Sequence, residues 1–302
     1  MQTIDFEGRE ITYPGTWNEM SRKQLISVAG LLLQQLSPLD FKLRLILKWL
    51  KLENRIFQYD NASWYIYGIY RINALFALWG IKKGKVRSFD SSDVYLLTET
   101  MNFLFSENQL PGEKPVISRN NQLTRQLIPS IRAGSTRLYG PADKMKNITS
   151  GEYAKAEHRY LAFIHSGDEK YLNELIAVLY RPRRRFAWLS RFIQQWDGEK
   201  RVPYHDYHLA RAADIAKVDL VTRFSIFLFF EGCRNLAVET HPNVFSSGAE
   251  EENSTGWAGI FQAISEKPTD IEELTRLNFW TLLFFLEQKA IHAARYSPNP
   301  ND

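Results

Sequence analysis

Apolar residues recur at helical spacing along most of the chain. Leu25, Val28 and Leu32 lie on one helical face behind Ser21. A glutamine follows Ser21 three residues later, and this is the spacing of a capping box at a helix N-terminus. The pattern therefore predicts a first helix over about residues 21–36.

The same periodicity predicts a series of further helices. Capping serines, threonines and aspartates mark their starts, and glycines or prolines mark their ends. The stretch that begins at Leu220 is hydrophobic nearly all round, which indicates a helix at the centre of a core. The expected helices cover about residues 38–52, 62–80, 93–104, 150–167, 169–181, 209–218, 220–238, 257–266 and 271–295.

A different pattern opens the chain. Between Thr3 and Tyr13, apolar and polar residues alternate around Glu7 and Gly8, as in a short β-hairpin. The expected fold class is therefore mainly α, with helical domains and a small N-terminal β-hairpin.

Turn-forming residues between the helices suggest how the chain divides. Residues 107–116 are rich in them, and residues 121–146 contain prolines and glycines spaced too closely for a long helix. We expect an N-terminal domain of hairpin and helices over residues 1–110, an irregular linker or arm over 111–148, and a C-terminal helical domain over 149–302. An exposed loop is expected over 245–255.

Composition places the chain among ordinary globular proteins. It is 44% hydrophobic and 24% charged, which excludes the composition of disordered chains. Aromatic residues make up 14%, and this leaves open whether they fill a bulky core or form apolar surface for partners. The apolar runs at 224–230 and 279–286 are shorter than the roughly 20 residues that span a bilayer, so we interpret both as buried helix segments.

Motifs that carry chemistry are weak. Cys233 is the single cysteine, which excludes an internal disulfide and fits a reducing cytoplasm, and its apolar surroundings predict an inert thiol. His205 and His208 have a spacing that could face one metal ion, but polar residues at a helix start explain them as well. We expect no catalytic residues, no metal and no cofactor.

One charged segment rises above background. Its arginines, together with a nearby tryptophan, could grip phosphates, dock on an acidic protein surface or simply face solvent. The net charge of +4 permits a nucleic-acid partner without requiring one. The candidate binding residues are Arg181, Arg183, Arg184, Arg185, Trp188 and Arg191.

Three stretches resemble known sequences. They are residues 13–25, residues 160–182, and Gly256 and Trp257 with the helices that follow them. These stretches resemble uncharacterised virion-morphogenesis proteins of tailed phages and prophages of Bacteroidota, including tail-assembly chaperones and accessory structural proteins. The resemblance implies an adaptor, chaperone or minor structural subunit in the cytoplasm of a bacterial host or in the virion.

These observations favour a noncatalytic protein-interaction module, an assembly factor whose partners are other protein subunits such as virion or tail components. The alternative is a nucleic-acid-binding accessory protein that uses the basic patch from Arg181 to Arg185.

Overall fold

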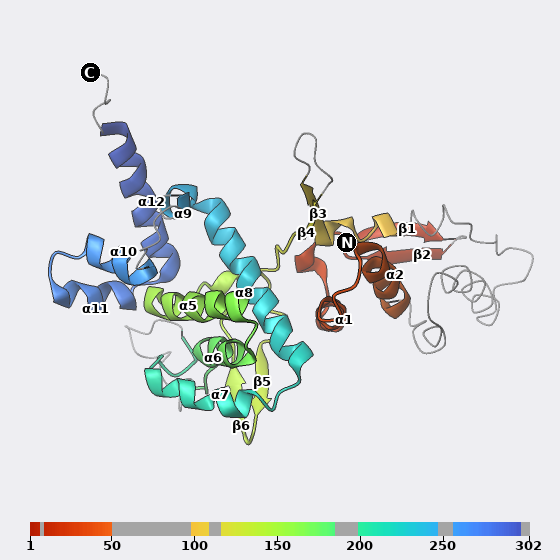
Figure 1. Ribbon diagram of the computed structural model, residues 1–302, viewed down its shortest axis with the longest axis horizontal. Coiled ribbons are helices and arrows are strands. Elements are labelled where there is room, and N and C mark those ends of the chain that lie inside the picture. Colours follow the sequence, from red (N-terminus) through yellow and green to blue (C-terminus); the bar gives the residue numbers. More distant parts are fainter. Residues whose placement is uncertain (7–8, 50–97, 109–115, 185–198, 247–255, 297–302) are drawn as a thin grey trace, which may run out of the picture. The chain divides into compact units, whose positions relative to one another are not determined.

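The computed structural model describes residues 1–6, 9–49, 98–108, 116–184, 199–246 and 256–296 (Figure 1). The chain divides into two compact units, unit 1 over residues 1–122 and unit 2 over 123–302. Within the described ranges the fold is mainly α with small two-stranded antiparallel sheets, which confirms the predicted fold class. The predicted helix over 62–80 and most of the predicted loop over 245–255 lie outside these ranges.

Unit 1 opens with the predicted hairpin. Strand β1 (Gln2–Phe6) pairs with β2 (Arg9–Tyr13) in antiparallel register. Helix α1 (Arg22–Leu32) begins at the predicted capping box, in which the Ser21 backbone N–H donates to the Gln24 side chain at 2.8 Å. The helix ends earlier than predicted, and Gln35 then adopts a left-handed φ of 51°.

The rest of unit 1 packs around a few large apolar side chains. A short 3-10 turn, η1 (Trp17–Glu19), buries its tryptophan, and α2 (Pro38–Trp49) follows α1. A second 3-10 turn, η3 (Asn102–Leu104), leads into an antiparallel pair of strands, β3 (Phe105–Asn108) and β4 (Val116–Arg119). The Phe105 ring meets Phe41 of α2 edge to face, with ring centroids 5.4 Å apart.

Unit 2 begins with a segment that sequence patterns placed in an irregular arm. Strands β5 (Ser130–Ala133) and β6 (Thr136–Tyr139) form an antiparallel hairpin, followed by the 3-10 turn η4 (Asp143–Met145). The segment buries Leu123 and Leu138 completely, and Gly232 lies so close to the Leu123 backbone that a Cβ atom there would collide with it. Residues 123–148 are therefore an integral part of unit 2.

The central helices of unit 2 begin at the predicted residues 150, 169 and 220. Thr149 and Asp168 cap α5 (Ser150–Ser166) and α6 (Glu169–Leu179), and Gly167 between them has the left-handed φ of 69° that ends α5. Asp219 caps α8 (Leu220–Thr240), in which Phe227, Phe229 and Phe230 are buried, as its hydrophobic pattern predicts. Helices α5 and α8 both pack against α6 in the middle of unit 2 (Figure 1).

The remaining helices are shorter or interrupted. They are η6 (Asp206–Arg211), α7 (Ala212–Ile215), α9 (Pro242–Ser246), α10 (Gly256–Ile264), α11 (Pro268–Arg276) and α12 (Phe279–Tyr296). The predicted helix over 271–295 is two helices, because Asn278 starts a new one: its side-chain oxygen accepts from the Trp280 N–H at 3.0 Å. The C-terminal part of α12 extends past the other helices of unit 2 (Figure 1). Over the described residues, no helix combines the length and apolar character needed to cross a membrane.

Candidate functional site

Arg181, the first predicted binding residue, is inside the protein. Its side chain is 0% exposed, and its Nη1 lies 2.5 Å from Oε1 of Glu152 on α5. Its backbone pairs with Tyr139 of β6 in both directions. Burial lowers the pKa of the Arg181 guanidinium, and the neighbouring Glu152 carboxylate opposes this effect. Arg181 is thus a structural cation and is not available to an external phosphate.

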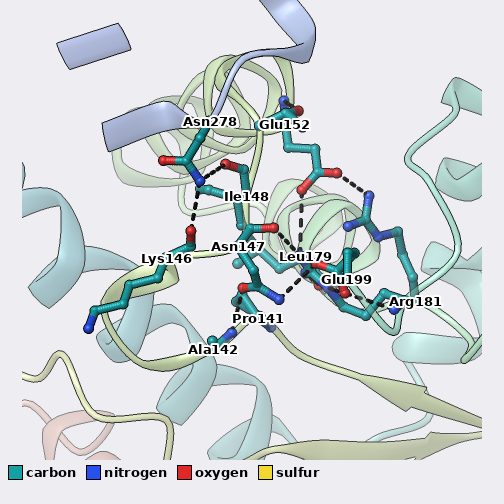
Figure 2. A network of polar contacts seen from close by, with 12 residues as sticks. Pro141, Ala142, Lys146, Asn147, Ile148, Glu152, Leu179, Arg181, Glu199 and Asn278 are labelled. Atoms are coloured by element: carbon teal, nitrogen blue, oxygen red, sulfur yellow. Dashed lines mark hydrogen bonds and ion pairs between the residues drawn. The ribbon is translucent and has the colours of Figure 1, made fainter. Parts of the chain in front are cut away.

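A second buried arginine completes the network in Figure 2. Arg201 Nη2 lies 2.8 Å from Glu199 Oε2 and 3.7 Å from Glu152 Oε2. Its guanidinium also donates to the carbonyls of Leu179, at 2.7 Å, and Asn147, at 3.1 Å. Two cations face two carboxylates, so the cluster is balanced in charge.

The network joins four parts of unit 2. It connects the start of α5, the end of α6, residues 199–201 and the loop at 142–147. The loop is held by a hydrogen bond from Asn147 Nδ2 to Glu199 at 2.7 Å. Removing one member of such a buried pair leaves an uncompensated charge in a low-dielectric interior. The network therefore fixes the positions of these four segments relative to one another.

The other predicted arginines are dispersed. Arg183 is exposed, and its backbone forms a bridge to Arg201. Arg184 is half-buried, and its Nε donates to the Arg201 carbonyl at 2.9 Å. Arg185, Trp188 and Arg191 lie outside the described residues. Of the predicted patch, only Arg183 is an exposed cation in the part of the chain that the structure describes.

The remaining candidates for chemistry are limited. Cys233 is buried, and burial raises the pKa of its thiol well above the ordinary value, as its apolar surroundings predict. The His205 side chain is exposed, and the side chain of His208 lies outside the part of the chain that the structure describes. Among residues with described positions, no group of three or more histidines, cysteines or acids is arranged to hold a metal ion.

A buried carboxylate connects three helices of the core. Glu157 on α5 is 6% exposed and accepts from Arg234 Nε of α8 at 2.7 Å and from the Tyr153 hydroxyl at 3.4 Å. It also accepts a hydrogen bond from Trp257 Nε1 of α10. Burial and the Glu157 charge raise the pKa of Tyr153 well above its ordinary value. The Tyr153 phenol is therefore unsuited to proton transfer near neutral pH, and the cluster docks α10 on the core.

Two neighbouring aromatic side chains on α12 are exposed. Phe284 is 56% exposed and Phe285 60%, and their ring centroids lie 6.1 Å apart at an interplanar angle of 66°. Phe279, Leu282 and Leu283 on the other side of the helix are buried. The interpretation of residues 279–286 as a buried helix segment is therefore wrong for Phe284 and Phe285.

Two side chains at the start of α12 bind the loop at residues 144–146. Trp280, one turn before Phe284, donates its Nε1–H to the Lys144 carbonyl at 2.8 Å, and Asn278 donates to the Lys146 carbonyl at 2.7 Å. Lys144 and Lys146 are exposed, and so is Lys289, one turn beyond Phe285. Along α12 itself, the exposed phenylalanine pair is thus followed by one exposed lysine.

The one acid near the centre of this helix points inward. Glu287 is 8% exposed, and its carboxylate accepts from Asn243 Nδ2 at 2.5 Å and from the Val244 N–H at 3.2 Å. It thereby binds the first turn of α9, where a negative charge is favourable. The sequence pattern of α12 shows which residues share a helical face. It does not show that the Glu287 carboxylate will accept hydrogen bonds from α9.

Comparisons with protein families, with curated proteins and with solved structures found no match. The candidate site therefore rests on its own geometry.

Proposed function

We propose that this chain is a noncatalytic protein-interaction module whose binding surface includes the exposed Phe284–Phe285 pair of α12. Phenylalanine side chains each bury about 150–250 Å² when covered, and full burial stabilises by about 1.5–3 kcal/mol per side chain. Two adjacent rings on a helix are the kind of anchor that dominates binding energy at protein interfaces. This pair is the observation that carries the proposal.

The noncatalytic part of the proposal is supported by how the described buried acids are used. Glu152 is paired with arginines, and Glu157 accepts bonds from Arg234, Tyr153 and Trp257. Glu157 is thus committed to protein donors, and Glu152 is held in ion pairs with two buried arginines.

The biological setting of the proposal comes from the sequence resemblance. We place the chain among virion or tail assembly factors of phages and prophages, working with other protein subunits in the cytoplasm of a bacterial host or in the virion. Exposed apolar surface on a subunit is consistent with that setting, because assembly factors cover the surfaces of partners before or within a particle.

Nucleic-acid binding is the alternative function. Its support in the described structure is Arg183, which is exposed next to the half-buried Arg184. Arg181 cannot contribute because it is buried against Glu152.

The test is affinity purification of the tagged protein from its native host, with and without nuclease, followed by mass spectrometry. The key variant is Phe284→Ser with Phe285→Ser. The matched control is Leu161→Ser with Ile164→Ser on α5, where the side chains are 39% and 51% exposed. Protein partners that survive nuclease and are lost only in the phenylalanine variant are expected. Recovery that collapses with nuclease would support the alternative, and partners unaffected by either variant would overturn the role of α12.

A further inference from the structure

Two arginines lie on the exposed face of the β5–β6 hairpin. Arg132 of β5 and Arg137 of β6 are directly opposite each other in the antiparallel register, and both side chains are exposed. The residues that alternate with them, Ile131, Ala133 and Leu138, are buried. One face of the hairpin is therefore packed on the rest of unit 2, and the other presents the two arginines to solvent.

The two arginines occupy the closer type of cross-strand position. The Gly140 N–H donates to the Pro129 carbonyl at 3.0 Å, so these residues form a hydrogen-bonded pair at one end of the hairpin. Because such pairs alternate with non-hydrogen-bonded pairs, Arg132 and Arg137 form a non-hydrogen-bonded pair, in which Cα atoms are about 4.5 Å apart. Like charges directly opposite each other destabilise a sheet. Folding by itself therefore disfavours this pair.

No described carboxylate offsets the repulsion. Arg137 Nε donates to the neutral Ser130 hydroxyl at 3.3 Å, and neither arginine forms an ion pair with a described residue. An acid close to the turn, Asp214, has its Oδ1 2.7 Å from Lys217 Nζ and is thus already matched by a cation. Residues 114–142 contain four arginines and one lysine but no aspartate or glutamate. The hairpin itself therefore carries only positive charge.

A third exposed arginine lies on the segment beside β6. Tyr139 and Arg181 form an antiparallel bridge in which each backbone N–H donates to the carbonyl of the other. Arg183 follows this bridge by two residues and Arg137 precedes it by two residues on the other segment, so both lie on the same side of the bridge. Arg183 forms no ion pair with a described residue. These neighbouring segments thus contribute three exposed guanidinium groups.

We infer that the β5–β6 hairpin binds double-stranded DNA in the major groove through Arg132 and Arg137. The major groove is about 12 Å wide and about 8.5 Å deep and admits a two-stranded ribbon, whose strands lie about 4.8 Å apart. Strands β5 and β6 have four residues each and extend about 13 Å at about 3.3 Å per residue. The turn that joins them lies at the outer edge of unit 2 in Figure 1. The hairpin therefore has the dimensions and the position that this groove requires.

The chemistry of the arginines fits the same ligand. A guanidinium group binds a phosphate, or the O6 and N7 edge of guanine, through two parallel hydrogen bonds. A bound duplex would also remove the repulsion between the two cations by placing anionic groups between them. The inference goes beyond the proposed function and does not depend on the α12 surface.

The exposed side chains of the hairpin disfavour other occupants. None of them is a large apolar or aromatic side chain, which the core of a protein interface or an anionic membrane surface would need. Single-stranded nucleic acid is bound by base stacking on aromatic side chains, and the major groove of duplex RNA is too deep and narrow for side chains to read. The exposed residues within β5, β6 and their turn are Arg132, Gly134, Ser135, Thr136 and Arg137.

The test is a titration of a fluorescent DNA duplex with the full-length protein at several salt concentrations. We expect a Kd of about 1–100 μM at about 50 mM salt, which is the range of non-specific duplex binding. Three phosphate contacts predict that the logarithm of the binding constant falls with the logarithm of the salt concentration at a slope of about −3. A single-stranded oligonucleotide, an RNA duplex, a polyglutamate peptide and anionic lipid vesicles are titrated in parallel.

Two double variants locate the binding. Arg132→Gln with Arg137→Gln should weaken duplex binding about 10-fold or more and make the salt dependence shallower. This variant should be at least as stable as the native chain, because it removes two cations that repel each other. The matched control, Arg22→Gln with Lys23→Gln, removes two adjacent exposed cations at the start of α1 and should leave the affinity unchanged.

Four results would overturn the inference. They are no duplex binding up to about 1 mM protein at about 50 mM salt, equal weakening by the two double variants, tighter binding of any of the four parallel ligands, and a lower free energy of unfolding in the arginine variant. The last result would show that the two arginines stabilise the fold instead of binding a ligand.

Discussion

Tyr153 and Phe279 lie face to face, with ring centroids 3.7 Å apart and ring planes 13° from parallel. The contact fixes the first residue of α12 on α5, in the centre of an aromatic core that also includes Phe230 and Trp257. Because the start of the helix is fixed in this way, its buried face is determined, and Phe284 and Phe285 are left on the solvent side.

Truncating phenylalanines on the two sides of α12 should have very different costs. Phe279→Ala removes a fully buried ring and is expected to lower the free energy of unfolding by about 3–5 kcal/mol. Phe284→Ala removes a side chain that is 56% exposed and should change it by less than about 0.5 kcal/mol. Denaturation in guanidinium measures both, and equal losses would contradict the assignment of the two faces.

The buried arginine network should respond strongly to the loss of one charge. Glu152→Gln keeps the shape of the side chain but leaves Arg181 uncompensated, so we expect a loss of about 3–5 kcal/mol in the free energy of unfolding. Adding Arg181→Met should restore part of this loss, because the pair between Arg201 and Glu199 remains.

The control for that experiment is an exposed ion pair. Glu272 and Arg276 are 69% and 75% exposed, and Glu272→Gln should have little measurable effect on stability. The variant with both Glu152→Gln and Arg181→Met should be more stable than Glu152→Gln alone. A lower stability would show that contacts other than the Glu152 charge stabilise Arg181.

Stability should fall at alkaline pH because of two buried acids. The pKa values of Tyr153 and Cys233 are both raised by burial, so the folded protein keeps protons that the unfolded chain releases above about pH 8.5 to 10. The stabilisation is present below the unfolded pKa values and is lost as pH rises from them toward the folded ones.

Variants without these protons should flatten the alkaline decline. Tyr153→Phe removes the phenol while keeping the ring, and Cys233→Ala removes the thiol. The measurement is the free energy of unfolding between about pH 7 and pH 11, relative to the native chain. A decline of unchanged slope in the combined variant would show that other groups cause it.

Packing of the β5–β6 segment on α8 can be tested at Gly232. Gly232→Ala places a methyl group against the Leu123 backbone, and overpacking of this kind costs about 1–3 kcal/mol.

In the native chain, trypsin should leave Arg125, Arg132 and Arg137 uncut although these side chains are exposed, because the backbone around them is packed. Early cleavage at Arg132 in the native protein would contradict this packing.

Helix starts were readable from local sequence in this protein. Ser21, Thr149 and Asp168 each cap a helix through bonds to backbone N–H groups two or three residues away, so a short window of sequence contains the whole interaction. The N-terminal hairpin was predictable for the same reason, since its alternation and its turn are contained in residues 2–13. The mainly α fold class follows from such local patterns.

Burial of charged and aromatic side chains depended instead on contacts between distant residues. Arg181 meets Glu152 across 29 residues, and Glu157 meets Trp257 across 100. An arginine run has the same local pattern whether it faces solvent or a buried carboxylate, and an apolar helix does not reveal which of its phenylalanines will find neighbours. The positions of Arg181 inside and of Phe284 and Phe285 outside were set by long-range packing, because the free energy of burying a side chain depends on which partners surround it in three dimensions.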